Sequence, residues 1–173
     1  MSTPPIASRH HLAVEALALR GDETVLEIGC GQGVATRLVL ERLTSGHITA
    51  IDRSEKMIAR LEPLTGGKLS AIAGAFEDVD FKGRQFDAIF AVNVELDLRL
   101  GDRWPGMVRD RLAESGLFVL AFEAPPGSGK GEAFARSATG KLERGGFTVS
   151  HRSTGHVSVL SARSLLEISA HDG

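Results

Sequence analysis

A glycine-rich segment and the acidic residue at the end of the next strand-like segment carry the clearest chemical signal in the sequence. Residues 27–33 read Glu-Ile-Gly-Cys-Gly-Gln-Gly and join a short apolar segment to an amphipathic one. Glycines permit a tight turn, so a ligand can lie against bare main chain at the amino end of a helix. Asp52 ends the second strand-like segment, and a carboxylate there can accept hydrogen bonds from both ribose hydroxyls. These residues indicate a site for a ligand that carries a nucleoside.

The spacing of the glycines differs from the fingerprint of dinucleotide-binding proteins. The dinucleotide fingerprint G-x-G-x-x-G requires a third glycine at position 34, where this chain has Val34. The chain reads G-x-G-x-G instead. A single glycine-rich turn can also serve only to pack a helix closely on a strand. Here the preceding strand, the following helix and the acid at the next strand end occur together, which favours ligand binding.

Strand-like and helix-like segments alternate along the chain and must position these residues. Strands are expected at 24–28, 47–51, 69–73, 86–92, 117–122, 147–152 and 156–162, and helices at 9–20, 34–43, 54–61, 104–113 and 133–143. Such alternation predicts an α/β fold with a doubly wound, mostly parallel sheet of seven strands. Gly155 predicts a turn that makes the last two strands an antiparallel hairpin. The interval between 73 and 86 leaves room only for an abbreviated crossover.

The chain is predicted to form a single domain over residues 1–173. Within it we expect a leading helix or lid at 1–20, a core at 21–162 and a tail at 163–173. The spacing of Val14, Leu17, Val39 and Leu43 predicts that these side chains belong to the core.

Several segments resemble the class I S-adenosylmethionine-dependent methyltransferases. Residues 24–33 are similar to the first motif of that family, and residues 51–54, with Met57 and Ile58, resemble its second. Residues 86–89 and 116–120 resemble its fourth and fifth strands. The resemblance runs in order from about residue 20 to residue 160, and it implies a Rossmann-like fold, methyl transfer and S-adenosylmethionine as the methyl donor.

Carried over position by position, the resemblance also implies a set of cofactor-binding residues. Glu27 would hold the amino group of the methionine portion, Asp52 would bind the ribose diol, and Arg53 would lie near the adenine. In this family an acid that contacts the adenine amino group often stands where this chain has Ala75, so adenine recognition would rely on backbone groups and Phe76. The complete set of expected cofactor residues is Glu27, Gly29, Cys30, Gly31, Gly33, Asp52, Arg53, Ala75, Phe76 and Asn93.

Composition argues against several other classes of function. The net charge of −2 offers no broad attraction for a phosphate backbone, so no nucleic-acid partner is expected. No apolar segment approaches the length of a membrane span, and no secretory signal is visible at the start of the sequence. The one cysteine, Cys30, cannot form an intramolecular disulfide, which fits a reducing compartment. We therefore expect a cytoplasmic protein without a membrane partner.

Four other features of the sequence give weaker signals for function. His10 and His11 are adjacent in a predicted helix and would point in different directions, so no metal site is expected. Residues 124–131 resemble a phosphate-binding loop but lack its first glycine and its final Ser or Thr, and we interpret them as a loop beside the substrate. Residues 9–12, in the leading segment, are candidates for substrate contacts. Glu95 and Asp97 could either accept a proton or lie in a solvated loop, and neither is assigned a catalytic role.

The leading hypothesis is therefore a methyltransferase that moves the methyl group of S-adenosylmethionine to a small-molecule acceptor. A non-catalytic subunit that binds S-adenosylmethionine for a partner is an alternative, because an intact nucleoside site argues for binding and not for turnover. An NAD-dependent oxidoreductase is a further alternative, because Asp52 alone suits either ribose.

Overall fold

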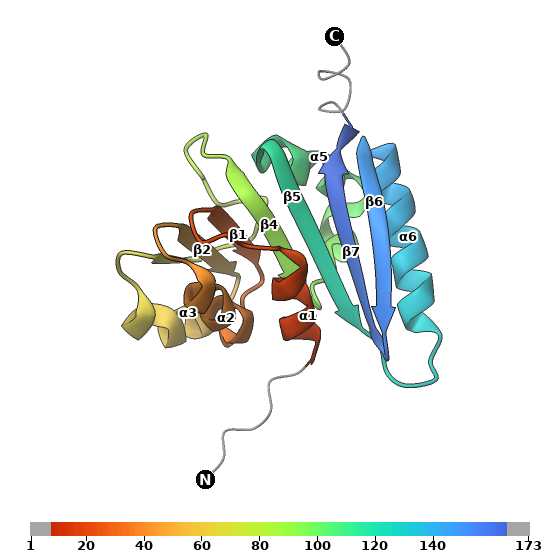
Figure 1. Ribbon diagram of the computed structural model, residues 1–173, viewed down its shortest axis with the longest axis horizontal. Helices are drawn as coiled ribbons and strands as arrows, with labels where there is room; N and C mark the ends of the chain where they lie inside the picture. Colours follow the sequence, from red (N-terminus) through yellow and green to blue (C-terminus); the bar gives the residue numbers. More distant parts are fainter. Residues whose placement is uncertain (1–7, 166–173) are drawn as a thin grey trace.

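The computed structural model describes residues 8–165, and these form a single seven-stranded sheet in the order β3-β2-β1-β4-β5-β7-β6 (Figure 1). Strands β1 to β5 run parallel, whereas β7 is antiparallel to β5 and β6 is antiparallel to β7. The predicted fold class, with its C-terminal hairpin, is therefore confirmed. The strands are β1 (Thr24–Ile28), β2 (His47–Asp52), β3 (Leu69–Ala73), β4 (Phe86–Val92), β5 (Leu112–Glu123), β6 (Phe147–Thr154) and β7 (Val157–Ser164).

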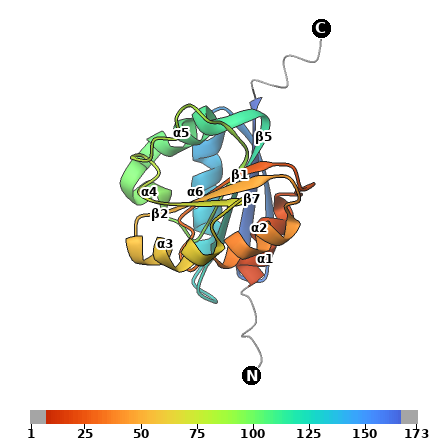
Figure 2. The same ribbon diagram turned by 90° about the vertical axis from the view of Figure 1, so that its left-hand side faces the viewer.

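Helices cover both faces of the sheet and bury one apolar cluster on each (Figure 2). Helices α1 (Ser8–Ala16), α2 (Val34–Arg42) and α3 (Glu55–Leu61) contribute to one cluster, which includes the predicted core residues Val14, Leu17, Val39 and Leu43. Helices α4 (Leu96–Leu100), α5 (Trp104–Arg111) and α6 (Lys130–Arg144) contribute to the other. Short 3-10 turns lie at Glu62–Leu64 and Gly101–Arg103.

The structure corrects several predicted boundaries. Helix α1 ends at Ala16, four residues before the expected end, and Ala18 takes a left-handed φ of 48°. Strand β5 begins at Leu112, so α5 ends at Arg111 where two more helical residues were expected. Strand β7 continues through Ser164, two residues into the predicted tail. Residues 166–173 of that tail and residues 1–7 of the proposed lid lie outside the described residues. Helix α4 was not predicted.

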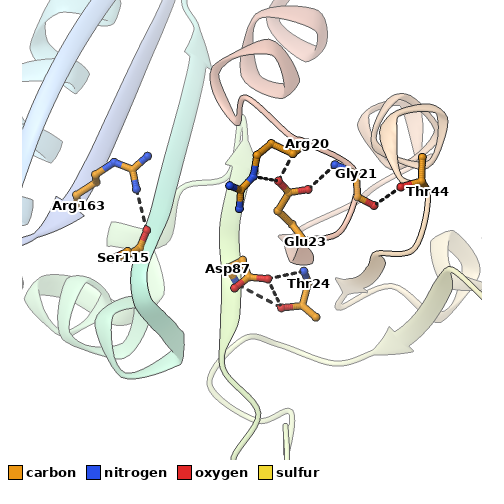
Figure 3. Close-up of polar contacts among 8 residues, drawn as sticks. All are labelled: Arg20, Gly21, Glu23, Thr24, Thr44, Asp87, Ser115 and Arg163. Carbon is orange, nitrogen blue, oxygen red and sulfur yellow. Dashed lines mark hydrogen bonds and ion pairs between the residues drawn. The ribbon is translucent and has the colours of Figure 1, made fainter.

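Hydrogen bonds fix the amino ends of the central strands, at the edge of the sheet where β1 and β4 begin (Figure 3). The Glu23 carboxylate accepts from the backbone N–H groups of Arg20 and Gly21 at 2.7 and 2.9 Å. The Asp87 carboxylate of β4 accepts from the N–H of Thr24 in β1 at 2.8 Å. These bonds lie at the end of the sheet opposite the loops that follow β1, β2 and β4.

Candidate functional site

A cavity of about 470 Å³ opens at the carboxyl ends of β1, β2 and β4. The sheet reverses its strand order between β1 and β4, and such a switch point is where open α/β sheets bind ligands. The volume lies within the range of small-molecule sites, about 300–1,000 Å³. Six of the ten expected cofactor residues line this cavity: Gly29, Asp52, Arg53, Ala75, Phe76 and Asn93.

Asp52 is held in place by the main chain of the two loops beside it. One carboxylate oxygen accepts from the N–H of Gly31 and the other from the N–H of Ser54, each at 2.9 Å. Each carboxylate oxygen can accept a further hydrogen bond. Asp52 thus presents two fixed acceptors to the cavity, and two neighbouring hydroxyl groups of a ligand are a chemical match for them.

The three glycines of the loop serve different purposes. A Cβ at Gly29 would stand 2.6 Å from the Val94 side chain, and one at Gly33 would stand 2.2 Å from the Leu61 side chain. These two glycines allow close packing. A Cβ at Gly31 would meet nothing within 4 Å, although its φ of +52° still favours glycine. Gly31 is therefore the glycine that faces open space, although it does not line the cavity itself.

Glu27 does not line the cavity. Its side chain lies buried on the face of β1 that packs against α2, where the Thr36 hydroxyl donates a hydrogen bond to it. Burial, with a smaller contribution from the charge of Asp52, raises the pKa of Glu27 to about 8. The Glu27 carboxyl is therefore mostly protonated at neutral pH.

Cys30 is likewise buried and outside the cavity lining. Burial, followed by the charges of Glu27 and Asp52, raises the pKa of the Cys30 thiol to about 12. Since the thiolate is the reactive form of cysteine, this side chain is chemically inert at neutral pH.

The remaining expected residues occupy the wall and rim of the cavity. Arg53 and Asn93 are exposed, whereas Ala75 and Phe76 are buried. Asn93 follows β4 with a φ of 54°, and its side-chain oxygen accepts from the N–H of Glu123 at 2.8 Å, which joins the ends of β4 and β5. Phe76 also packs against Phe81 in the core, so its ring position is fixed from behind.

Sequence reasoning missed Glu77, which also lines the cavity. One of its carboxylate oxygens pairs with the Arg99 guanidinium of α4, and the other is buried without a hydrogen-bond partner. A buried, unpaired carboxylate oxygen is unfavourable unless a ligand donates to it. The available signal was the acid two positions after Ala75 on the same loop.

The two acids that follow β4, Glu95 and Asp97, differ in whether their charge is already paired. Asp97 accepts hydrogen bonds from the Trp104 indole at 2.6 Å and from Lys141 at 2.9 Å, so its charge is already balanced. Glu95 is exposed and lines the cavity. Of these two residues, only Glu95 therefore offers an unbalanced charge to a ligand.

Other candidate segments lie outside the cavity lining. Arg9 pairs with Glu123 at the end of β5 at 2.5 Å, and Leu12 lines a separate cavity between α1 and the C-terminal hairpin. Residues 124–129 form the loop before α6, and Gly129 caps that helix. Residues 8–165 contain no group of three or more His, Cys, Asp or Glu residues that could hold a metal ion. No helix in this described part of the chain is long and apolar enough to cross a membrane.

Comparison with known proteins identifies a methyltransferase domain. The model of that family matches residues 25–112, about half of the chain. Among sequence relatives, trans-aconitate 2-methyltransferase of Streptomyces avermitilis is 33% identical over 112 residues, which are 61% of this chain and 40% of that protein. Sterol 24-C-methyltransferase erg-4 of Neurospora crassa is 28% identical over 92 residues, which are 50% of this chain and 24% of that protein. The chain thus spans less than half the length of both relatives.

Solved structures share the fold at lower sequence identity. The 1,6-didemethyltoxoflavin-N1-methyltransferase of Burkholderia thailandensis, solved with 1,6-didemethyltoxoflavin and S-adenosylhomocysteine, superposes with a TM-score of 0.69 at 18% identity. The match covers 91% of this chain and 77% of that one. The arrangement of strands and helices is therefore one that known methyltransferases also use.

Proposed function

The chain belongs to the methyltransferase domain family, and from this premise we propose that it transfers the methyl group of S-adenosylmethionine to a small-molecule acceptor. The observation that carries the proposal is the position of Asp52. Its carboxylate is fixed by Gly31 and Ser54 at the rim of the cavity at the switch point of the sheet. A ribose diol is the ligand group that this pair of acceptors fits best.

We propose that the chain holds the donor along the carboxyl ends of β1, β2 and β4. Asp52 would accept from the ribose hydroxyls, and the main chain around Gly31 would lie against the methionine portion. Asn93 and Gly29 would border the methionine end, while Arg53, Ala75 and Phe76 would border the adenine. When bound, S-adenosylmethionine supplies an electrophilic methyl group on a sulfonium, and transfer of this group leaves a neutral thioether.

We assign Glu27 and Gly33 supporting roles in this site. Glu27 lies behind the glycine loop with Thr36, and Gly33 lets α2 pack closely against Leu61. Neither would touch the donor directly, which differs from the role that the resemblance implied for Glu27. Cys30, buried and protonated, would contribute its backbone only.

We propose that the buried free oxygen of Glu77 accepts from the adenine amino group. This would supply, two positions along the loop, the acid that is missing at Ala75. Glu77→Ala should then reduce the preference for S-adenosylhomocysteine over its 6-oxo analogue, S-inosylhomocysteine, by about tenfold, the effect of one lost hydrogen bond to a charged group. Competition calorimetry with both ligands measures this ratio.

Arg99→Ala is the matched control for this variant, because it breaks the same ion pair but leaves the Glu77 carboxylate in place. It should keep most of the preference for the amino-bearing ligand. If Glu77→Ala leaves the ratio of the two affinities unchanged, Glu77 does not bind the adenine amino group.

Gly31→Val should weaken the binding of S-adenosylhomocysteine by about tenfold or more, because its side chain would enter the open space in front of the loop and strain a backbone at φ +52°. Gly83→Val is a matched control, since Gly83 has a φ of +73° and open space around it on a distant loop. Urea unfolding should show similar destabilisation for both variants, by about 1–3 kcal/mol. Calorimetry should show a binding loss only for Gly31→Val, and equal binding in both would exclude the loop as a ligand surface.

Calorimetric titration with S-adenosylmethionine, S-adenosylhomocysteine and NAD tests the proposal as a whole. Saturable binding of the two sulfur ligands but not of NAD is expected. Transfer of tritiated methyl groups to a panel of small acceptors then separates an enzyme from a non-catalytic binding subunit. Selective binding of NAD would contradict the proposal and support an oxidoreductase.

We also propose that the protein works in the cytoplasm or another reducing compartment. Its one cysteine is a buried free thiol, so the described fold relies on packing and hydrogen bonds for its stability. The net charge of −2 favours a small acceptor over a nucleic acid.

A further inference from the structure

A second, smaller cavity adjoins the proposed donor site. It measures about 200 Å³ and shares four wall residues with the larger cavity: Val94, Glu95, Leu96 and Leu98. Val94 also lies against Gly29 of the glycine loop. The two cavities therefore meet at the segment that follows β4, beside the proposed methionine end of the donor.

The interior of the smaller cavity is apolar. The walls that it does not share with the donor site come mainly from β5, α5 and α6, through Leu120, Trp104, Phe134 and Ala138. Phe134 is fixed by a stacked contact with Phe122, whose ring centroid lies 4.3 Å away. Trp104 is buried, and its indole N–H is already bonded to Asp97. Few polar groups are left for a ligand in the depth of this cavity.

The balance of charge around the cavity limits the ligand further. Asp97 is paired with Lys141, which contacts Asp102 as well. Glu95 at the junction has no such partner among the ion pairs of the described residues. A carboxylate at the entrance of an apolar cavity disfavours anionic ligands through like-charge repulsion.

Building on the proposed function, we propose that this cavity binds the methyl acceptor, and that the acceptor is an uncharged, mostly apolar molecule of about one substituted aromatic ring. The size follows from the volume, because a dry apolar cavity of about 150 Å³ holds benzene. The apolar body occupies the space beside Trp104 and Phe134. The nucleophilic atom faces the junction at Val94 and Glu95.

The indole fluorescence of the protein comes from a side chain that lines this cavity. The sequence contains one tryptophan, Trp104, and no tyrosine. A brominated ring quenches indole fluorescence on contact, so 4-bromophenol serves as the neutral probe and 4-bromobenzoate as the anionic probe of the same shape. Both are titrated into the protein at neutral pH, with and without saturating S-adenosylhomocysteine.

We expect saturable quenching by 4-bromophenol and at least about tenfold weaker quenching by 4-bromobenzoate. Glu95→Gln should narrow this difference, because it removes the charge at the entrance. Absence of saturable quenching in protein that binds S-adenosylhomocysteine would overturn the inference, and so would equal binding of the two probes. Failure of S-adenosylhomocysteine itself to bind would instead contradict the proposed function, and with it the acceptor role of the cavity.

Two variants localise the probe. Ala138→Leu fills the cavity from α6 and should weaken 4-bromophenol by about tenfold, whereas Ala133→Leu makes the same change at an exposed position of the same helix and should have no effect. Leu98→Asp introduces a polar group at a side chain that is 79% exposed, so it leaves the core intact and should also weaken the probe. Unchanged quenching in both cavity variants would place the probe elsewhere.

Discussion

Asp52→Ala is expected to weaken the binding of S-adenosylhomocysteine by about 100-fold or more, the largest effect of any single side chain in the proposed site. Two ribose hydroxyls would lose a charged acceptor, and each such hydrogen bond contributes about 1.5–3 kcal/mol. The substitution also leaves the N–H groups of Gly31 and Ser54 without the oxygens that orient both loops. Calorimetric titration measures the loss.

Asp110→Ala provides the matched control, because Asp110 is exposed on α5, outside the lining of the donor cavity. It should bind the ligand as the unmodified protein does. If Asp52→Ala binds S-adenosylhomocysteine with full affinity, and circular dichroism shows an intact fold, the ribose does not bind at Asp52.

Glu27 is expected to make the protein less stable as the pH rises. The folded state holds the Glu27 proton with a pKa of about 8, against an ordinary value of 4.5. The folded state thus binds more protons than the unfolded state between these values. Its contribution to stability is complete below about pH 4.5 and is lost as pH rises through about 8. The free energy of unfolding should fall by up to about 1.4 kcal/mol per pH unit between about pH 5.5 and 7.5.

Glu27→Gln should flatten this dependence, since the amide keeps a partner for Thr36 but cannot ionise. Glu55→Gln is the control, because Glu55 is exposed at the start of α3 and should leave the slope unchanged. Urea unfolding at several pH values supplies the data. Parallel slopes for the unmodified protein and Glu27→Gln would show that Glu27 is ionised in the folded state.

Local patterns predicted most of the fold because each central element carries its own signal. Strands β1, β3 and β4 begin and end at the predicted residues, since buried parallel strands are short apolar segments bounded by turn residues. Helix α4 was missed because its five residues are too few to display a helical period. The extension of β5 back to Leu112 depends on pairing with Phe86, which is a contact distant in sequence.

The sequence predicts which residues line the cavity when they stand at a strand end. It predicts less well the residues whose position depends on burial or on a distant partner. The position of Asp52 at the end of β2 placed it correctly on the cavity. Glu27 is one residue before such an end, and strand alternation turns its side chain to the face that packs against α2. The contribution that we propose for Glu77 depends on Arg99 pairing with only one of its oxygens, and no spacing rule indicates this.

The hydrogen bonds that fix the amino ends of β1 and β4 have a consequence for protein engineering. Glu23 binds the turn before β1, and Asp87 of β4 binds Thr24 of β1, both at the edge opposite the cavities, so this anchoring and the choice of ligand depend on different parts of the chain. The exposed positions of the segments after β4 and β5 could therefore be diversified in a library while the scaffold stays constant. In such a library, variants with new acceptor preferences should keep the melting temperature of the parent protein.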